Sequence, residues 1–227
     1  MRTIVFDSGP VITLAMNDLL WVLNDLKKRF LGDFLISNDV KNEIVDRPLL
    51  SKKYKFEAVR ILNLIEEGGL KVYPGDLRKK TEILMELANN MFYAKGRPIV
   101  LVHRAEIESL ALANAVNADA VAIDERTTRQ ILENPKKLAA LLERKMRTPV
   151  AYNGATYREF QKEVGKINVI RSVDLVTVAY ELGLLNRYLF KPELKKTLLE
   201  GVLWGVKLNG CSVSQEEIND IMKIEGF

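Results

Sequence analysis

The stretch IVFDSGPVITLA, residues 4–15, places an aspartate between two apolar runs. The branched and aromatic side chains of residues 4–6 are typical of a short buried strand. Asp7 follows that strand directly. Because burying an unpaired carboxylate is unfavourable, we expect Asp7 either to serve a function or to cap the helix that follows it.

Similar strand-like segments recur along the chain and alternate with helical ones. This alternation favours the α/β fold class, with a central, mainly parallel sheet flanked by helices. We expect strands at residues 2–6, 33–37, 70–73, 120–123 and 167–170. We expect helices at residues 17–30, 38–46, 54–67, 76–94, 105–117 and 125–146, the second ending before Pro48 and the last broken near Asn134.

The pattern becomes wholly helical from Ser172 onward, with helices predicted at residues 173–184, 192–206 and 214–223. Ser214 and Glu217 have the spacing of a capping box at the start of the last helix. We therefore expect residues 1–171 to form an α/β domain and residues 172–227 a helical C-terminal extension packed on it. The extension should bury the apolar side chains of Leu175, Val178, Leu182, Leu198 and Val202.

The composition excludes several kinds of catalytic site. The chain of 227 residues has one cysteine, Cys211, and one histidine, His103. Multi-cysteine metal sites and HExxH zinc chemistry are therefore excluded, and a serine or cysteine triad is disfavoured. A catalytic site must be built mainly from carboxylates, hydroxyls and basic groups. The net charge of +4 permits a polyanionic partner.

No apolar run in the sequence approaches the length of a transmembrane helix. The start of the chain also lacks the pattern of a secretory signal peptide, because the apolar run after Arg2 is short and ends at Asp7. We expect a cytoplasmic protein without a membrane partner.

Four acidic residues are expected to converge at one edge of the predicted sheet. Asp7 and Asp124 follow two strands directly, and parallel strands place such residues at the same edge. Glu43 lies in the helix after the second strand, and Glu106 opens the helix before Asp124. Four carboxylates without histidine or cysteine suit a hard cation, Mg²⁺ or Mn²⁺. Such a site acts naturally on a phosphodiester, because the metal activates water and stabilises charge at the phosphorus.

Two of these assignments leave a neighbouring acid as an alternative. Glu108 competes with Glu106, which we favour because it lies in the first turn of its predicted helix. Glu125 competes with Asp124, which we favour because it stands at the strand end. Asp7 itself could be a helix cap as well as a ligand.

A basic run begins directly beside Asp124. Arg126 and Arg129 either belong to a solvated helix face or bind the phosphates of a nucleic acid, and their position next to the expected metal favours phosphate binding. Ser8, next to Asp7, would add a hydroxyl to the same phosphate-binding set.

The stretches VFDSGPVITL, ISNDVKNEI and AEIESLALANAVNADAVAIDERTTRQIL together resemble the PIN-domain family of metal-dependent nucleases. Members carry an Asp followed by Ser or Thr after the first strand and an acid in a V-x-x-E-I/L helix. They then carry an acid opening a helix rich in small residues and an Asp closing the fourth strand. Asp7 with Ser8, Glu43, Glu106 and Asp124 match these positions. The resemblance covers residues 1–146 well and the C-terminal helices loosely.

The resemblance implies an endoribonuclease that uses Mg²⁺ or Mn²⁺ to cleave single-stranded RNA. It suggests the toxin of a toxin–antitoxin pair, with a small antitoxin protein as partner, or an RNA-processing nuclease, and it suggests a homodimer. The sequence departs from the family at two places. Ala105 stands where a Gly usually precedes the third acid, and Arg171-Ser172 stands where Gly-Thr usually follows the fifth strand. These departures bear on fine positioning, with Ser172 as a weak substitute for the threonine.

Two rival functions belong to other classes. A non-catalytic RNA-binding or scaffold PIN domain is the main alternative, and the four intact acids argue against it. A phosphatase of the haloacid dehalogenase type also has an Asp after its first strand, but it needs a second Asp where Gly9 stands.

Overall fold

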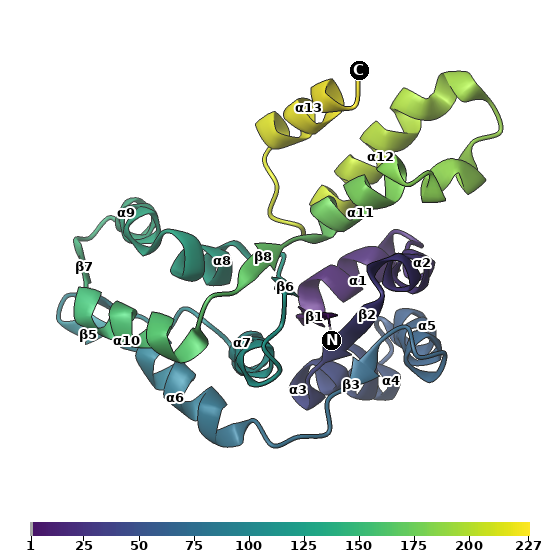
Figure 1. The fold of residues 1–227 in the computed structure, drawn as a ribbon. Helices are drawn as coiled ribbons and strands as arrows, with labels where there is room; N and C mark the ends of the chain where they lie inside the picture. Colours follow the sequence, from purple (N-terminus) through teal and green to yellow (C-terminus); the bar gives the residue numbers. More distant parts are fainter. Residues whose placement is uncertain (1) are drawn as a thin grey trace.

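A computed structural model describes residues 2–227 of the chain. These residues form a five-stranded central sheet in the order β3-β2-β1-β6-β8, shown in Figure 1. Neighbouring strands of this sheet pair in parallel. The strands are β1 (Arg2–Phe6), β2 (Gly32–Ile36), β3 (Lys71–Val72), β6 (Ala120–Ala122) and β8 (Asn168–Ile170). The predicted α/β class with a mainly parallel sheet is confirmed.

The helices that connect these strands cover both faces of the sheet. They are α1 (Ser8–Met16), α2 (Trp21–Phe30), α3 (Asn38–Lys41), α4 (Arg47–Leu50), α5 (Lys55–Glu66), α6 (Arg78–Asn89), α7 (Arg104–Ala115), α8 (Arg126–Glu133), α9 (Pro135–Met146) and α10 (Gly154–Val164). A π-helical turn at Asn42–Asp46 joins α3 to α4. The prediction that this helix ends before Pro48 was wrong, because a proline in the first turn of α4 removes no N–H that the segment needs.

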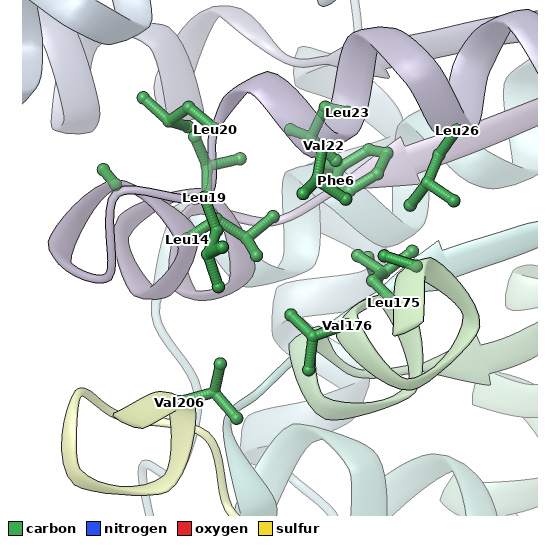
Figure 2. Packing of buried hydrophobic residues seen from close by; sticks show 14 of the residues in the cluster. Phe6, Leu14, Leu19, Leu20, Val22, Leu23, Leu26, Leu175, Val176 and Val206 are labelled. Atoms are coloured by element: carbon green, nitrogen blue, oxygen red, sulfur yellow. The ribbon is translucent and has the colours of Figure 1, made fainter. Parts of the chain in front are cut away.

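Successive residues of β1 feed two separate apolar clusters. Ile4 and Phe6 belong to one cluster, and Val5 belongs to the other. This is the alternation expected of a strand whose side chains point to opposite faces of a sheet. Figure 2 shows Phe6 packed with α2 and with Val176 on the first face. Because β1 is buried on both faces, its end fixes the position of Asp7.

A second, antiparallel sheet was missing from the sequence prediction. It has the order β5-β4-β7, with β4 (Phe92–Ala94), β5 (Arg97–Pro98) and β7 (Val150–Tyr152). The helix predicted over residues 76–94 instead stops at Asn89. Lys95 and Gly96 have φ values of 50° and 74°, which is the left-handed backbone that a two-residue hairpin turn requires.

The C-terminal helices are α11 (Ser172–Glu181), α12 (Lys195–Leu208) and α13 (Gln215–Ile224), with 3₁₀ turns at Leu184–Tyr188 and Pro192–Leu194 between the first two. The predicted capping box of Ser214 and Glu217 starts α13. α11 contacts α1 and α2, and Figure 1 shows α11, α12 and α13 beyond β8.

The predicted burial of the α11 side chains is confirmed for Leu175 and wrong for Val178 and Leu182. Leu175 is buried, whereas Val178 and Leu182 are 43% and 40% exposed. The buried face of α11 is instead Leu175, Val176 and Ala179, which points toward the sheet and α1. Leu198 and Val202 on α12 are half-buried. Among residues 2–227, no helix is long and apolar enough to cross a membrane.

Candidate active site

Asp7 and Asp124 lie at the ends of β1 and β6, two neighbouring parallel strands. The Asp7 N–H donates to the Ala122 carbonyl at 3.0 Å, which ties the ends of the two strands together. Both carboxylates are buried, with 2% and 1% of their surface exposed. A Cβ atom added at Gly9 would lie 3.3 Å from Asp124 Cβ and 3.7 Å from Asp7 Oδ2. The two acids therefore border one small gap that the glycine leaves open.

The surroundings of the Asp7 carboxyl disfavour its charged form. Its pKa is raised from an ordinary value of 3.8 to about 7, and burial is the largest cause. The negative charges of Glu106 and Glu43 also raise it, while the N–H groups of Ser8 and Gly9 lower it.

One oxygen of the Asp7 side chain also lacks a partner among the residues that the structure describes. Within the described part of the chain, Asp7 Oδ1 is buried without a hydrogen-bond partner. Asp7 occupies the N-cap position of α1, but within residues 2–227 its side chain makes no capping hydrogen bond. Helix capping thus accounts poorly for this aspartate.

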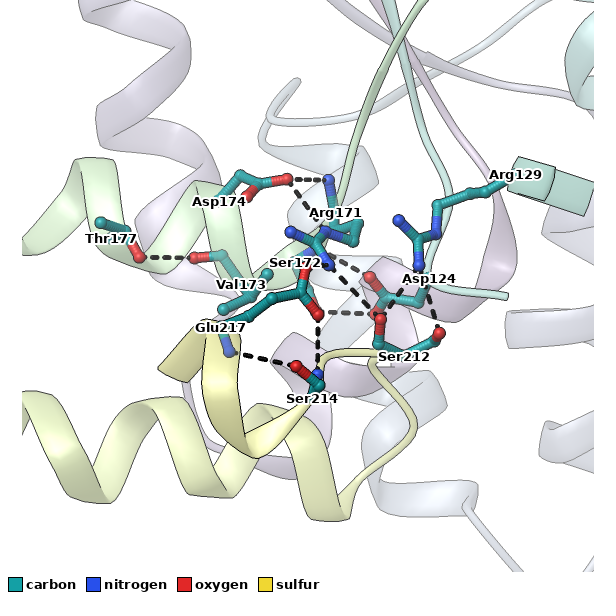
Figure 3. Close-up of polar contacts among 10 residues, drawn as sticks. All are labelled: Asp124, Arg129, Arg171, Ser172, Val173, Asp174, Thr177, Ser212, Ser214 and Glu217. Carbon is teal, nitrogen blue, oxygen red and sulfur yellow. Dashed lines mark hydrogen bonds and ion pairs between the residues drawn. The ribbon is translucent and has the colours of Figure 1, made fainter. Parts of the chain in front are cut away.

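Asp124 is held by residues far along the chain. The Ser172 N–H donates to Asp124 Oδ1 and the Ser172 hydroxyl to Oδ2, both at 2.7 Å, as Figure 3 shows. The Ser212 N–H donates to the Asp124 carbonyl at 3.1 Å. Ser172, which was expected to be a weak substitute for the family threonine, thus donates two hydrogen bonds to the Asp124 carboxylate.

The two glutamates of α7 have different partners. Glu106 Oε2 accepts hydrogen bonds from the Thr128 hydroxyl at 2.7 Å and from the His103 N–H at 3.4 Å. Burial raises the pKa of Glu106, and its charge in turn acts on Asp7. Glu108 instead accepts the N–H of Asp39 at the start of α3, at 3.3 Å. Burial, followed by its contact with Asp39, raises the pKa of Glu108. Glu106 is therefore the acid of this pair whose charge acts on Asp7.

Glu43 is exposed and lies in the π-helical turn after α3. It borders a surface cavity of about 430 Å³ together with Arg47, His103 and Arg104. Its charge reaches Asp7 and helps to raise the pKa of that carboxyl. The four predicted acids thus differ in burial, since the two aspartates are buried and Glu43 is exposed.

Among residues 2–227, no group of three or more His, Cys, Asp or Glu side chains is arranged as a ready-made metal shell. The donor set nevertheless fits a hard cation, because Asp7 Oδ1 is a buried acceptor without a protein donor. Each oxygen of the Asp124 carboxylate accepts one hydrogen bond from Ser172, and a carboxylate oxygen can accept more than one. The assignment of all four acids as metal ligands remains a prediction.

The predicted phosphate-binding residues lie near the same edge. Ser8 is buried at the start of α1, and Arg126 is exposed at the start of α8. Arg129 is half-buried and donates to the carbonyl and hydroxyl oxygens of Ser212, at 3.0 and 3.2 Å. Their role in binding RNA also remains a prediction.

Two further residues contribute to the site and were not predicted. Thr128 bonds Glu106, and its place in the first turn of the helix that follows Asp124 could have pointed to it. Ser212 bonds both Asp124 and Arg129, and nothing in its local sequence pattern indicates such a role.

A family model described as a PIN domain matches residues 3–136, which is more than half of the chain. The chain belongs to the PIN-domain family. A search of curated proteins and a search of solved structures gave no significant match. PIN domains are generally nucleases, and the matched range contains Asp7, Glu43, Glu106 and Asp124. Ser172, which holds Asp124, lies outside the range that defines the PIN-domain match.

Proposed function

We propose that this PIN domain is an endoribonuclease that requires Mg²⁺ or Mn²⁺ and cleaves single-stranded RNA. The observation that supports this proposal best is the Asp7 carboxyl, which is buried, has an unpaired oxygen and shares the Gly9 gap with Asp124. A protein gains nothing in stability from such a carboxyl unless a cation or another donor reaches it.

Three of the four acids have distinct parts in the proposed site. Asp7 and Asp124 would hold the cation at the strand ends, and Ser172 keeps Asp124 in a fixed orientation. Glu106, oriented by Thr128, would add charge from the side of α7. Bound Mg²⁺ or Mn²⁺ would lower the pKa of a water and stabilise the charge that develops at the phosphorus.

The basic residues beside this edge suit the phosphates of the substrate. Arg126 begins α8 two residues after Asp124 and is exposed, so its guanidinium is free to reach a strand lying over the acids. Guanidinium groups bind phosphate through paired N–H donors. We assign Arg126 and Ser8 to phosphate contact, with Arg129 as a more constrained neighbour.

The alternative is a PIN domain that binds RNA without cleaving it. The presence of all four acids favours catalysis, because a pure binding surface for RNA has no use for four carboxylates that repel phosphate. The toxin role, a small antitoxin partner, a homodimer and a cytoplasmic location remain predictions drawn from the sequence and the family resemblance.

The test is cleavage of end-labelled single-stranded RNA of mixed sequence, with Mg²⁺ or Mn²⁺ and then with chelator. We expect metal-dependent internal cleavage that falls by about a hundredfold or more in Asp7→Asn and Glu106→Gln, since both lose a charged ligand. Glu108→Gln is the matched control from the same helix, and it should retain most of the activity. Equal losses in Glu106→Gln and Glu108→Gln would contradict the assignment. A wild type that binds this RNA without cleaving it would favour the alternative.

A further inference from the structure

A second cavity, of about 680 Å³, opens between α8–α9 and the segment that joins α12 to α13. Arg126, Arg129, Gln130 and Lys137 line it from one side, and Lys207 and Ser212 from the other. No role in the proposed cleavage has been given to Gln130, Lys137 or Lys207. We call this cavity the α8 pocket.

The side chains from α8 reach the α8 pocket because of their spacing. Arg126, Arg129 and Gln130 follow the three- and four-residue steps that place side chains on one face of a helix. Thr128 lies on another face and bonds Glu106 of the candidate active site. One short helix therefore serves the acids with one face and the α8 pocket with the other.

Arg129 and Gln130 line the α8 pocket, and each carries a buried polar atom that lacks a partner in the described part of the chain. In the described range, 2–227, buried side-chain atoms without a hydrogen bond are Asp7 Oδ1, Arg129 Nε and Gln130 Oε1. Gln130 is only 9% exposed. Buried polar groups in folded proteins are normally paired, so an unpaired one suggests a missing ligand or water. Here a donor and an acceptor stand on adjacent residues, which indicates a ligand that both accepts and donates.

The charge of the α8 pocket favours an anion. Two arginines and two lysines line it against two glutamates. One of these glutamates, Glu217, is already engaged by Arg171 at 2.7 Å and by the Ser214 N–H at 2.8 Å (Figure 3). The cations therefore exceed the free carboxylates, and a phosphate would satisfy the arginine donors.

The α8 pocket and the candidate active site share a wall. Ser212 borders the pocket, donates its N–H to the Asp124 carbonyl and accepts from Arg129, and Figure 3 shows the three residues next to one another. A polymer with one phosphodiester at the acids could thus place a neighbouring residue in the α8 pocket. A phosphodiester only accepts hydrogen bonds, whereas the rest of a ribonucleotide offers base N–H groups and a 2′-hydroxyl as donors.

We propose that the α8 pocket binds one ribonucleotide of the RNA strand. Its phosphate would bind the cationic side chains. A base N–H or the 2′-hydroxyl would donate to Gln130 Oε1, which is buried here and would reach the ligand once the Gln130 amide turns toward the pocket. This proposal rests on the proposed function, because it assumes that the strand whose phosphodiester lies at Asp124 continues into the pocket. It adds selectivity for base or sugar, which the four acids cannot supply.

The test measures binding without cleavage, using the full-length Asp7→Asn variant in chelator and fluorescence anisotropy of labelled hexanucleotides. The four homopolymeric RNAs, the matching DNAs and an abasic ribose strand serve as probes. We expect affinity to differ by about tenfold between the best RNA and either the worst RNA or its DNA counterpart. Discrimination among bases would assign the donor to the base, and discrimination between RNA and DNA would assign it to the 2′-hydroxyl.

Substitutions separate this pocket from general electrostatic attraction. Gln130→Leu should remove the difference in affinity between the probes, so that all of them bind about as weakly as the worst probe binds the parent protein. Gln130→Met provides a second apolar variant if the first fails to fold. Lys137→Gln should weaken binding of every probe and reduce its dependence on salt. Lys196→Gln, an exposed lysine of α12 outside the pocket, is the matched control and should bind like the parent protein.

The outcomes distinguish this inference from the proposed function. If the Asp7→Asn variant discriminates between the probes but the wild type with Mg²⁺ or Mn²⁺ cleaves no RNA, the endoribonuclease proposal is refuted and the pocket remains assigned. Cleavage with selectivity that survives both Gln130 substitutions would overturn the pocket and leave the endoribonuclease. Displacement of RNA by inorganic phosphate and by a polyglutamate peptide as effectively as by unlabelled RNA would also overturn it, since the pocket would then be an unselective anion site.

Discussion

Replacing Asp7 with asparagine should stabilise the metal-free protein, and by an amount that grows with pH. The unfolded chain loses the Asp7 proton near pH 3.8, whereas the folded protein retains it until about pH 7. Between these values the folded state binds more protons, so the stability due to this group falls as the pH rises. The asparagine side chain does not titrate and carries no such penalty.

The magnitude follows from the same two values. An interval from 3.8 to about 7 corresponds to an upper limit of about 4 kcal/mol, at about 1.36 kcal/mol per pH unit. The difference in unfolding free energy between variant and wild type should therefore rise from near zero below pH 4 to at most about 4 kcal/mol above pH 7.

Urea denaturation of both proteins between pH 4 and 8, in chelator, measures this difference. The exposed carboxylate Asp220 gives a control, since Asp220→Asn should run parallel to wild type. A divalent cation reverses the order if Asp7 binds it. At a hundred times its dissociation constant, Mn²⁺ should stabilise wild type by about 2.7 kcal/mol and Asp7→Asn much less. Parallel pH curves for wild type and Asp7→Asn, or equal stabilisation of both by Mn²⁺, would refute the reasoning.

Other predictions concern the surroundings of Asp124. Ser172→Ala removes the hydroxyl bond to the Asp124 carboxylate and should cost about 1.5–3 kcal/mol in urea denaturation, with Ser172→Thr restoring most of it; an unchanged stability would mean that the bond contributes nothing. Burial, followed by the charge of Asp124, raises the pKa of the Cys211 thiol to about 11, so a disulfide reagent at pH 8 should modify it slowly in the folded protein and rapidly in urea. Equal rates would show that Cys211 is accessible. Gly9→Ala places a methyl group 3.3 Å from Asp124 Cβ and should lower RNA cleavage while changing stability by no more than about 1 kcal/mol; full activity would show that the gap is not used.

The central sheet could be predicted because its strands are short apolar runs that end in polar residues. β1 and β6 are nearly continuous runs of buried residues, so their carboxyl ends, and with them Asp7 and Asp124, were predictable. The second sheet was not, because β4 has three residues and acquires its identity by pairing with β7, far along the chain. A local pattern cannot report a pairing of that kind.

The same limit applies to the candidate site. The positions of the acids follow from strand ends and helix starts, which are local features. The bonds that orient Asp124 come from Ser172, 48 residues away, and from Ser212, beyond two further helices. These hydrogen bonds depend on tertiary packing. The sequence therefore predicted only a minor role for Ser172, whereas in the structure it donates two hydrogen bonds to Asp124.

The bonds from Ser172 and Ser212 to Asp124 also impose an order in time. Synthesis proceeds from the N-terminus, and the segments made first begin to fold while the rest is still being produced. All four acids are made before residue 125, whereas the two serines that fix Asp124 come later. A nascent chain that has not yet reached Ser172 and Ser212 thus has its acids but not their final arrangement. Under the proposed function, the nuclease becomes competent only after these two serines have been made and have packed against Asp124, and the RNA being translated is spared until then.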